Sequence, residues 1–312
     1  MPYDIPILLL IFKRPDLTQL VFDRVREIQP QQLFISADGA RSHKEGETEL
    51  VAQTRQIFDQ VDWDCEVHTL YRDQNLGCRR AVSGGINWFF DHVEQGIILE
   101  EDCVPDPSFF QFTKEMLEKY KDHDEVMSIS GLNLIQNQFS DLPTSYLYTK
   151  FVFYWGWATW RSAWKKMDVD MKRFPEFVEK NYISRLLSDK DAQKYIIQKF
   201  HETHTKQNDS WAYAWFYNCI LHNGLAIVPK NNLIENVGFG DQATHTKIPE
   251  KAFQTKSKAL TFPLVAPQKI EAAPYKVAHQ FFYAGHKSRF LLTVNRVFPK
   301  KFVRWVGNLL GK

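Results

Sequence analysis

The sequence predicts an α/β fold in which helices flank a mostly parallel sheet and a helical tail follows. Short apolar runs alternate with segments of helical periodicity over roughly the first hundred residues, a repetition typical of parallel sheets. Two of these runs end in acidic residues, and ligands bind at the carboxyl ends of strands in such sheets. With 44% hydrophobic and 24% charged residues, the 312-residue chain can bury a sizeable core.

Each element has its own signature. Short apolar or alternating runs predict strands at residues 7–12, 33–36, 65–70 and 96–99. Helical spacing of apolar residues predicts helices between these strands, at residues 17–28, 50–58 and 81–93. Beyond an irregular aromatic region we expect helices at 176–200 and 211–222, a strand at 225–229, and a polar loop from 238 to about 263.

The C-terminal end differs from the rest of the chain in charge. Residues 272–312 contain eight Lys or Arg and no Asp or Glu, interleaved with aromatic residues, whereas all 37 acidic residues precede them. We therefore expect a body at residues 1–265 and a basic, aromatic helical appendage at 266–312. The appendage either lies on an anionic membrane surface or packs on the body with a basic outer face.

Composition argues against several classes of protein. A net charge of +2 is too small to indicate nucleic-acid binding, and the four cysteines lack metal-finger spacing. No run approaches the roughly 20 apolar residues of a membrane span, and the first residues do not resemble a secretory signal. We expect a cytoplasmic protein with free thiols, peripheral at the inner face of the cell membrane if the tail binds lipid.

The run Glu100-Glu101-Asp102 ends an apolar strand with three adjacent carboxylates. Adjacent acids repel each other, and Mn²⁺ or Mg²⁺ held by Asp102 would join them to a diphosphate. The alternative is an exposed acidic turn before the helix that opens at residues 105–108.

Other candidate ligands also follow strands. Asp38 ends the second strand, where a carboxylate can contact a base or ribose or can simply make an Asp-Gly turn. Arg72 and Arg80 flank the start of the helix at 81–93, where they either bind phosphate or belong to a solvated loop.

The second half of the chain offers a candidate base. Asp209 precedes the helix at 211–222 and is either its cap, as Ser210 also could be, or a general base for an acceptor hydroxyl. In the aromatic run 151–160, which is mostly expected in the core, Gly156-Trp157 would let backbone approach a ligand. His245 is a late candidate metal ligand.

Taken together, these segments resemble the metal-dependent inverting GT-A glycosyltransferases, above all the N-acetylglucosaminyltransferase I type. The similarity extends from about Pro6 to His245 in the same order. It rests on these segments: Arg14 after the first strand, Ser36-Ala37-Asp38-Gly39, the acidic run continued by Pro105-Asp106-Pro107-Ser108-Phe109-Phe110, Phe153 to Trp157, Asn208-Asp209-Ser210-Trp211, and Asn236-Val237-Gly238-Phe239-Gly240.

The resemblance implies that residues 1–265 are a catalytic domain that uses a nucleotide-sugar donor. It implies that Asp102 holds the metal and that Asp209 is the base. Contacts with the donor are implied for Asp38, Glu100 and Glu101. Gly156-Trp157 resembles the family's segment near the donor sugar, and Arg14 its basic loop. Arg72 and Arg80 are donor candidates from their place before a helix, in a segment that looks more like general bacterial GT-A enzymes. The run Glu-Glu-Asp departs from the usual Glu-Asp-Asp of the family, which leaves the contact of Glu101 with the donor open.

The predicted function is transfer of a sugar, most simply from a UDP-sugar, to a glycan or lipid-linked acceptor of the cell envelope, with inversion. One alternative is a nucleotidyltransferase that makes nucleotide sugars, although Phe12-Lys13-Arg14-Pro15 has no glycine-rich phosphate loop. The other is a non-catalytic glycan-binding module that uses the aromatic cluster.

Overall fold

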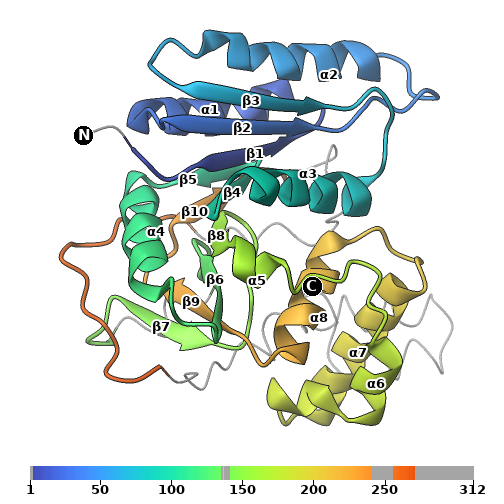
Figure 1. Ribbon diagram of the computed structural model, residues 1–312, viewed down its shortest axis with the longest axis vertical. Coiled ribbons are helices and arrows are strands. Elements are labelled where there is room, and N and C mark those ends of the chain that lie inside the picture. Colours follow the sequence, from blue (N-terminus) through green and yellow to red (C-terminus); the bar gives the residue numbers. More distant parts are fainter. Residues whose placement is uncertain (1–2, 135, 137–140, 240–255, 271–312) are drawn as a thin grey trace, which may run out of the picture.

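One eight-stranded sheet forms the centre of the protein in the computed structural model, which describes residues 3–134, 136, 141–239 and 256–270 (Figure 1). The strand order is β3-β2-β1-β4-β8-β6-β9-β7. Helices cover both faces, so the predicted α/β class with a mostly parallel sheet is confirmed. The appendage predicted at 266–312 lies outside the described residues except for 266–270.

The first half of the sheet is parallel throughout. It contains β1 (Ile7–Ile11), β2 (Gln32–Ala37), β3 (Glu66–Tyr71) and β4 (Gln95–Glu100), with β1 between β2 and β4. Between these strands run α1 (Pro15–Ile28), α2 (Glu47–Gln56) with the 3-10 helix η1 (Ile57–Gln60), and α3 (Cys78–His92). Each of these elements lies within a few residues of its predicted position.

The second half of the sheet mixes directions. It contains β6 (Val126–Ser130), β7 (Tyr146–Thr149), β8 (Trp157–Trp160) and β9 (Leu225–Pro229). Strand β8 runs antiparallel between β4 and β6, β9 is parallel to β6, and β7 is antiparallel at the edge. A small antiparallel pair, β5 (Cys103–Pro105) with β10 (Ile234–Asn236), brings the chain after β9 back beside the end of β4.

The alternation of side chains along β1 explains the two layers of helices. Ile7, Leu9 and Ile11 belong to the core on the side of α1 and α4 (Pro107–Tyr120). Leu8 and Leu10 belong to the core on the side of α3 and α8 (Trp211–Leu221). A strand buried on both faces reads as a continuous apolar run, which is the pattern that predicted it.

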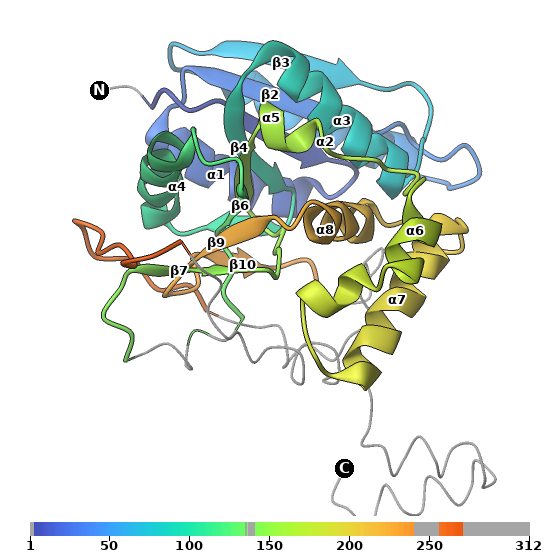
Figure 2. The same ribbon diagram turned by 60° about the horizontal axis from the view of Figure 1, so that its bottom comes forward.

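A group of helices extends the second core. It contains α5 (Arg161–Trp164), α6 (Phe174–Glu179), the 3-10 helix η3 (Tyr182–Arg185) and α7 (Lys190–His204). The predicted single helix at 176–200 is therefore wrong: Asn181 adopts a left-handed conformation (φ 51°), and Asp189 caps a new helix, α7. In both views α8 lies between the sheet and α6 with α7 (Figure 2).

Part of the predicted polar loop at 238–263 packs on the body. Leu260 is buried with the α1–α4 core, and the Lys258 amide donates to the Asn232 carbonyl (2.8 Å). Among the described residues, no helix is both long and apolar enough to cross a bilayer. The four cysteines are free thiols.

Candidate active site

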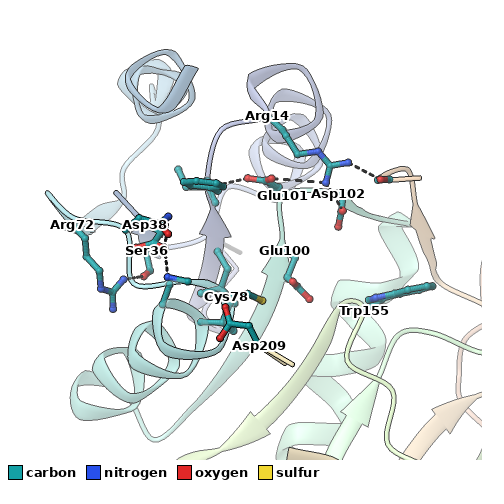
Figure 3. A pocket seen from close by; sticks show the side chains of 18 of the residues that line it. Arg14, Ser36, Asp38, Arg72, Cys78, Glu100, Glu101, Asp102, Trp155 and Asp209 are labelled. Atoms are coloured by element: carbon teal, nitrogen blue, oxygen red, sulfur yellow. Dashed lines mark hydrogen bonds and ion pairs between the residues drawn. The ribbon is translucent and has the colours of Figure 1, made fainter. Parts of the chain in front are cut away.

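A cavity of about 360 Å³ opens at the carboxyl ends of β1, β2 and β4 (Figure 3). Its wall is completed by the start of α3, by Trp155, by Asp209 and by residues 236–239. The predicted site residues that line it are Arg14, Asp38, Arg72, Glu100, Glu101, Asp102 and Asp209. The parallel order of β2, β1 and β4 explains this grouping, because it brings their carboxyl ends to one edge.

Arg14 neutralises part of the acidic run that follows β4. One guanidinium nitrogen donates to Asp102 Oδ2 (2.8 Å) and lies 3.9 Å from Glu101 Oε1, while the other donates to the Gly238 carbonyl (2.7 Å). Glu101 also accepts from the Phe12 amide. Gly238 packs so closely on Asp102 that an added Cβ would lie 1.9 Å from Oδ2. The loops after β1, β4 and β10 therefore meet at Asp102.

Three neighbouring carboxyl groups share this single arginine, and the charged forms of two of them are disfavoured. Burial raises the pKa of Glu100 to about 8, repulsion from Asp102 and Glu101 adds to the rise, and Arg14 opposes it. Burial also raises the pKa of Glu101 to about 8, with repulsion from Asp102 as the next cause. The Glu100 carboxylate points into the cavity and makes no hydrogen bond or ion pair with another described residue (Figure 3). A bound cation would relieve this repulsion.

Two carboxylates at the cavity wall are the groups available to a divalent metal. The described residues contain no group of three or more His, Cys, Asp or Glu that could hold a metal alone. Mg²⁺ is commonly bound through one or two carboxylates together with substrate phosphates. Asp102 and the unpaired Glu100 can supply those carboxylates at the cavity wall. His245 lies outside the described residues.

Asp38 holds the loop before α3 against the end of β2. Its carboxylate accepts from the amides of Gly39 and Leu76 (both 3.0 Å) and Gly77 (3.2 Å), and from the Asn75 side chain (3.0 Å). Burial is the main cause that raises the pKa of Asp38, and these hydrogen bonds oppose the rise. Most of its acceptor sites are thus used within the protein.

Arg72 lies beside Asp38 at the end of β3 and remains available to a ligand. It donates to Ser36 Oγ (3.1 Å), and burial lowers the pKa of its guanidinium while the charge of Asp38 opposes this. No ion pair joins Arg72 to a carboxylate within the described part of the chain. A half-buried guanidinium with unused donors suits phosphate or carbonyl oxygens.

Asp209 reaches the cavity from the turn between α7 and α8. Ser210, rather than Asp209, caps α8 by accepting from the Tyr213 amide (3.4 Å). Asp209 Oδ2 lies against Gly77, where an added Cβ would be 2.6 Å away. Burial is the main cause that raises the pKa of the Cys78 thiol, followed by Glu100, Asp209 and Asp38. These three carboxylates therefore face one space, as Figure 3 shows.

Three predicted ligand residues lie elsewhere. Arg80 is half-exposed and pairs with Asp170 (2.8 Å) outside the cavity lining. Trp157 is fully buried in β8, stacked on Trp211 with ring centroids 5.9 Å apart. Gly156 has a positive φ (58°) and packs on Ile234, where an added Cβ would meet Cδ1 at 2.3 Å. The glycine thus serves core packing.

Sequence reasoning missed several lining residues: Phe12, Arg41, Asn75, Cys78, Trp155, Asn236 and Phe239. Phe12 directly follows β1, so its place at a strand end was a usable signal. Trp155 precedes β8, and its ring lies 5.6 Å from that of Phe239, which is far away in the sequence. No local pattern distinguishes Trp155 from the buried Trp157.

Comparisons with known proteins identify no family for the chain. No family model and no curated protein matches the chain. Solved structures that match include a UDP-glucose pyrophosphorylase complexed with UDP-glucose (13% identity, 48% of this chain and 64% of that chain, TM-score 0.27). A second is 4-diphosphocytidyl-2C-methyl-D-erythritol synthase from Anaerococcus prevotii (12% identity, 70% of this chain and 99% of that chain, TM-score 0.31). A third is mouse xyloside xylosyltransferase 1 in its apo form (9% identity, 70% of this chain and 81% of that chain, TM-score 0.35).

The match to HddC from Yersinia pseudotuberculosis spans 56% of that chain, at 12% identity, 40% of this chain and a TM-score of 0.26. Because these TM-scores are low, the fold class is assigned from the observed sheet and its helices.

Proposed function

We propose that the protein is a metal-assisted glycosyltransferase that moves a sugar from a nucleoside-diphosphate donor to an acceptor hydroxyl. The observation that carries this proposal is the shared cavity of Asp102 and Asp209 (Figure 3). One carboxylate follows β4 beside Arg14, and the other comes from the turn before α8, more than a hundred residues later in the chain. Two acidic groups in one cavity can divide the work of binding the leaving group and activating the acceptor.

The donor would lie along the strand ends. Arg72, Ser36 and the loop held by Asp38 form the end suited to the nucleoside, and Arg14 with Asp102 form the end suited to the diphosphate. Mn²⁺ or Mg²⁺ at Asp102 would offset the negative charge on the departing diphosphate. UDP is the proposed nucleotide because the resembled family uses it.

Asp209 is proposed as the base. Its carboxylate has no hydrogen bond or ion pair to another described residue, and Ser210 supplies the cap that α8 requires. Asp209 therefore has acceptor capacity free for the proton of an acceptor hydroxyl. Attack on the anomeric carbon from the side opposite the diphosphate would invert its configuration.

The acceptor is proposed to be a glycan or a lipid-linked sugar of the cell envelope. The basic, aromatic residues of the appendage fall almost entirely outside the described residues. Its contact with an anionic membrane surface therefore stays a prediction from sequence.

Turnover of a nucleotide-sugar panel tests the proposal. UDP- and GDP-linked hexoses and N-acetylhexosamines would be incubated with the protein, with and without Mn²⁺, and nucleoside diphosphate release would be measured. We expect slow metal-dependent hydrolysis of at least one donor, and its loss in Asp102→Asn but not in Asp91→Asn, an exposed control on α3. Release of pyrophosphate from UTP and a sugar 1-phosphate, without donor hydrolysis, would instead identify a nucleotidyltransferase.

A further inference from the structure

The turn that carries Asp209 is held in place by a set of buried and half-buried contacts. It leaves α7 at His204 and enters α8 at Trp211. The amides of Gln207 (2.8 Å) and Asn208 (3.2 Å) both donate to the Glu202 carbonyl. The backbone is therefore closed onto the last turn of α7 immediately before Asp209.

The Asn208 side chain connects the residue after Asp209 with the helix that precedes it. Its Oδ1 accepts from the Ser210 amide (3.3 Å), and Thr203 Oγ1 lies 2.9 Å from the same oxygen. An N–H can only donate, so the atom that faces Ser210 must be the acceptor of the Asn208 amide group. One side chain thus ties the residue after Asp209 to α7.

Arg79 connects this turn to the opposite wall of the cavity. It follows Gly77 and Cys78, which line the cavity, and it is only 4% exposed. Its guanidinium donates to the Thr203 carbonyl (2.7 Å) and to the Val169 carbonyl. Thr203 itself is fully buried. The start of α3 and the Asp209 turn are therefore fixed to each other through one residue.

We propose that Asn208, supported by Arg79 through Thr203, is a positioning residue that aims the Asp209 carboxylate into the cavity. The inference rests on the proposed function, since it assigns a role to neighbours of the proposed base. Asp209 has no hydrogen bond of its own to another described residue, so its direction depends on the backbone on either side. Asn208 fixes that backbone at Ser210, and Arg79 fixes α7 relative to Gly77, against which Asp209 lies.

The test combines Asn208→Ala with Asp209→Asn. In hydrolysis of the donor found in the panel, we expect Asn208→Ala to lower kcat about 10- to 100-fold, the loss that a small misplacement of a reacting group can cause. The Kd for UDP with Mn²⁺, measured by calorimetry, should stay within about twofold. The double variant should be no slower than Asp209→Asn, because the positioned group is already gone. An additive further loss, or weaker UDP binding, would overturn the proposal in favour of a general structural role.

A second measurement does not depend on turnover. Hydrogen exchange of a peptide covering residues 205–213 should be faster in Asn208→Ala and unchanged in Lys194→Ala, a control at an exposed residue of α7. Asn208→Asp keeps the acceptor oxygen and should restore slow exchange. Unchanged exchange in Asn208→Ala would show that the Asn208 side chain does not stabilise the backbone of this turn. If Asn208→Ala does not fold, Thr203→Val serves instead: it removes the hydroxyl that contacts Asn208 and the Lys199 carbonyl and keeps the Asn208 side chain.

The outcomes separate the two proposals. Wild-type turnover in Asp209→Asn would refute the assignment of the base, whatever Asn208 does. An inactive Asp209→Asn beside a fully active Asn208→Ala would refute only the positioning role.

Discussion

The two halves of the central sheet contribute to the cavity in different ways. In the first half, β1, β2 and β4 are parallel, and the residues that follow each strand line the cavity directly. In the second half, β8 and β7 are antiparallel to their neighbours, and the lining residues come from connections and from the turn before α8. Because β8 runs antiparallel to β4, the residues that precede β8, such as Trp155, lie at the edge where β4 ends.

The halves also differ in what stabilises them near the cavity. The first half holds its loops with charged groups, such as Asp38 with the loop before α3 and Glu47 with Lys13 and Arg41. Behind the second half lies an aromatic core, in which the rings of Trp157, Trp211, Trp215 and Trp164 contact one another. The comparison teaches that ion pairs and hydrogen bonds hold the loops of the first half, whereas the turn that carries Asp209 combines hydrogen bonds of Asn208 and Arg79 with the aromatic core at Trp211.

The largest expected effect comes from a substitution on the side of the second half that leaves the first half intact. Asp209→Asn should lower donor turnover about 10²- to 10⁴-fold, because a positioned general base contributes an acceleration of that size. The affinity for UDP with Mn²⁺ should be unchanged, since the nucleotide side of the cavity is intact. Turnover assays and calorimetry on the same preparation check this result. Turnover near that of the wild type would mean that Asp209 is not the base.

Trp157 and Trp155 provide the next test, because they are close in sequence but differ in burial. Trp157→Ala should lower the free energy of unfolding by about 4 kcal/mol, as large aromatic truncations in a core do. Trp155→Ala, at the half-buried cavity wall, should cost far less stability. Urea unfolding of both variants measures the contrast. Equal losses would show that Trp155 belongs to the same rigid core as Trp157.

The same two tryptophans show where sequence reasoning stops. The strands β1 to β4 were predictable because each is a short apolar or alternating run in a regular strand–helix repeat. The region that forms β6, β7 and β8 has no such repeat. Its strands take their places through pairings between distant segments, β8 and β6 between β4 and β9, and β7 at the edge beyond β9. Local sequence therefore could not distinguish a ring in β8 from one at the cavity wall.

The residues of the candidate site also divide into those predictable from local sequence and those that were not. Glu100, Asp102 and Asp38 were placed at one edge from strand ends alone, and they line the cavity together. Asp209 required a resemblance, because nothing local relates the start of α8 to the end of β4. Arg80 lies elsewhere because its position on α3 turns it toward Asp170.

The smallest expected effect concerns the ion pairs of Glu47 in the first half of the molecule. Glu47, the first residue of α2, is buried between Lys13 (2.6 Å) and Arg41 (Nε, 2.9 Å), and the latter lines the cavity. The hydrogen bonds from Arg41 are the main cause that lowers the pKa of Glu47 to about 2. Burial opposes this shift, and the hydrogen bond from Lys13 adds to it. Glu47→Gln removes the charge and should lower the free energy of unfolding by about 2 kcal/mol at neutral pH.

The sign of the pH dependence then sharpens the comparison. The pKa of Glu47 is lower in the folded state than its usual 4.5, so its contribution is complete above that value and is lost as the pH falls through about 2. The gap between wild type and Glu47→Gln should therefore shrink as urea unfolding is repeated from about pH 7 to about pH 3. Glu49→Gln, exposed on the same helix, is the matched control. The gap caused by Trp157→Ala should not change over this range, because apolar packing binds no protons. A constant gap for Glu47→Gln would place its stabilisation in packing, and the contrast between the two halves of the sheet would then be wrong at this position.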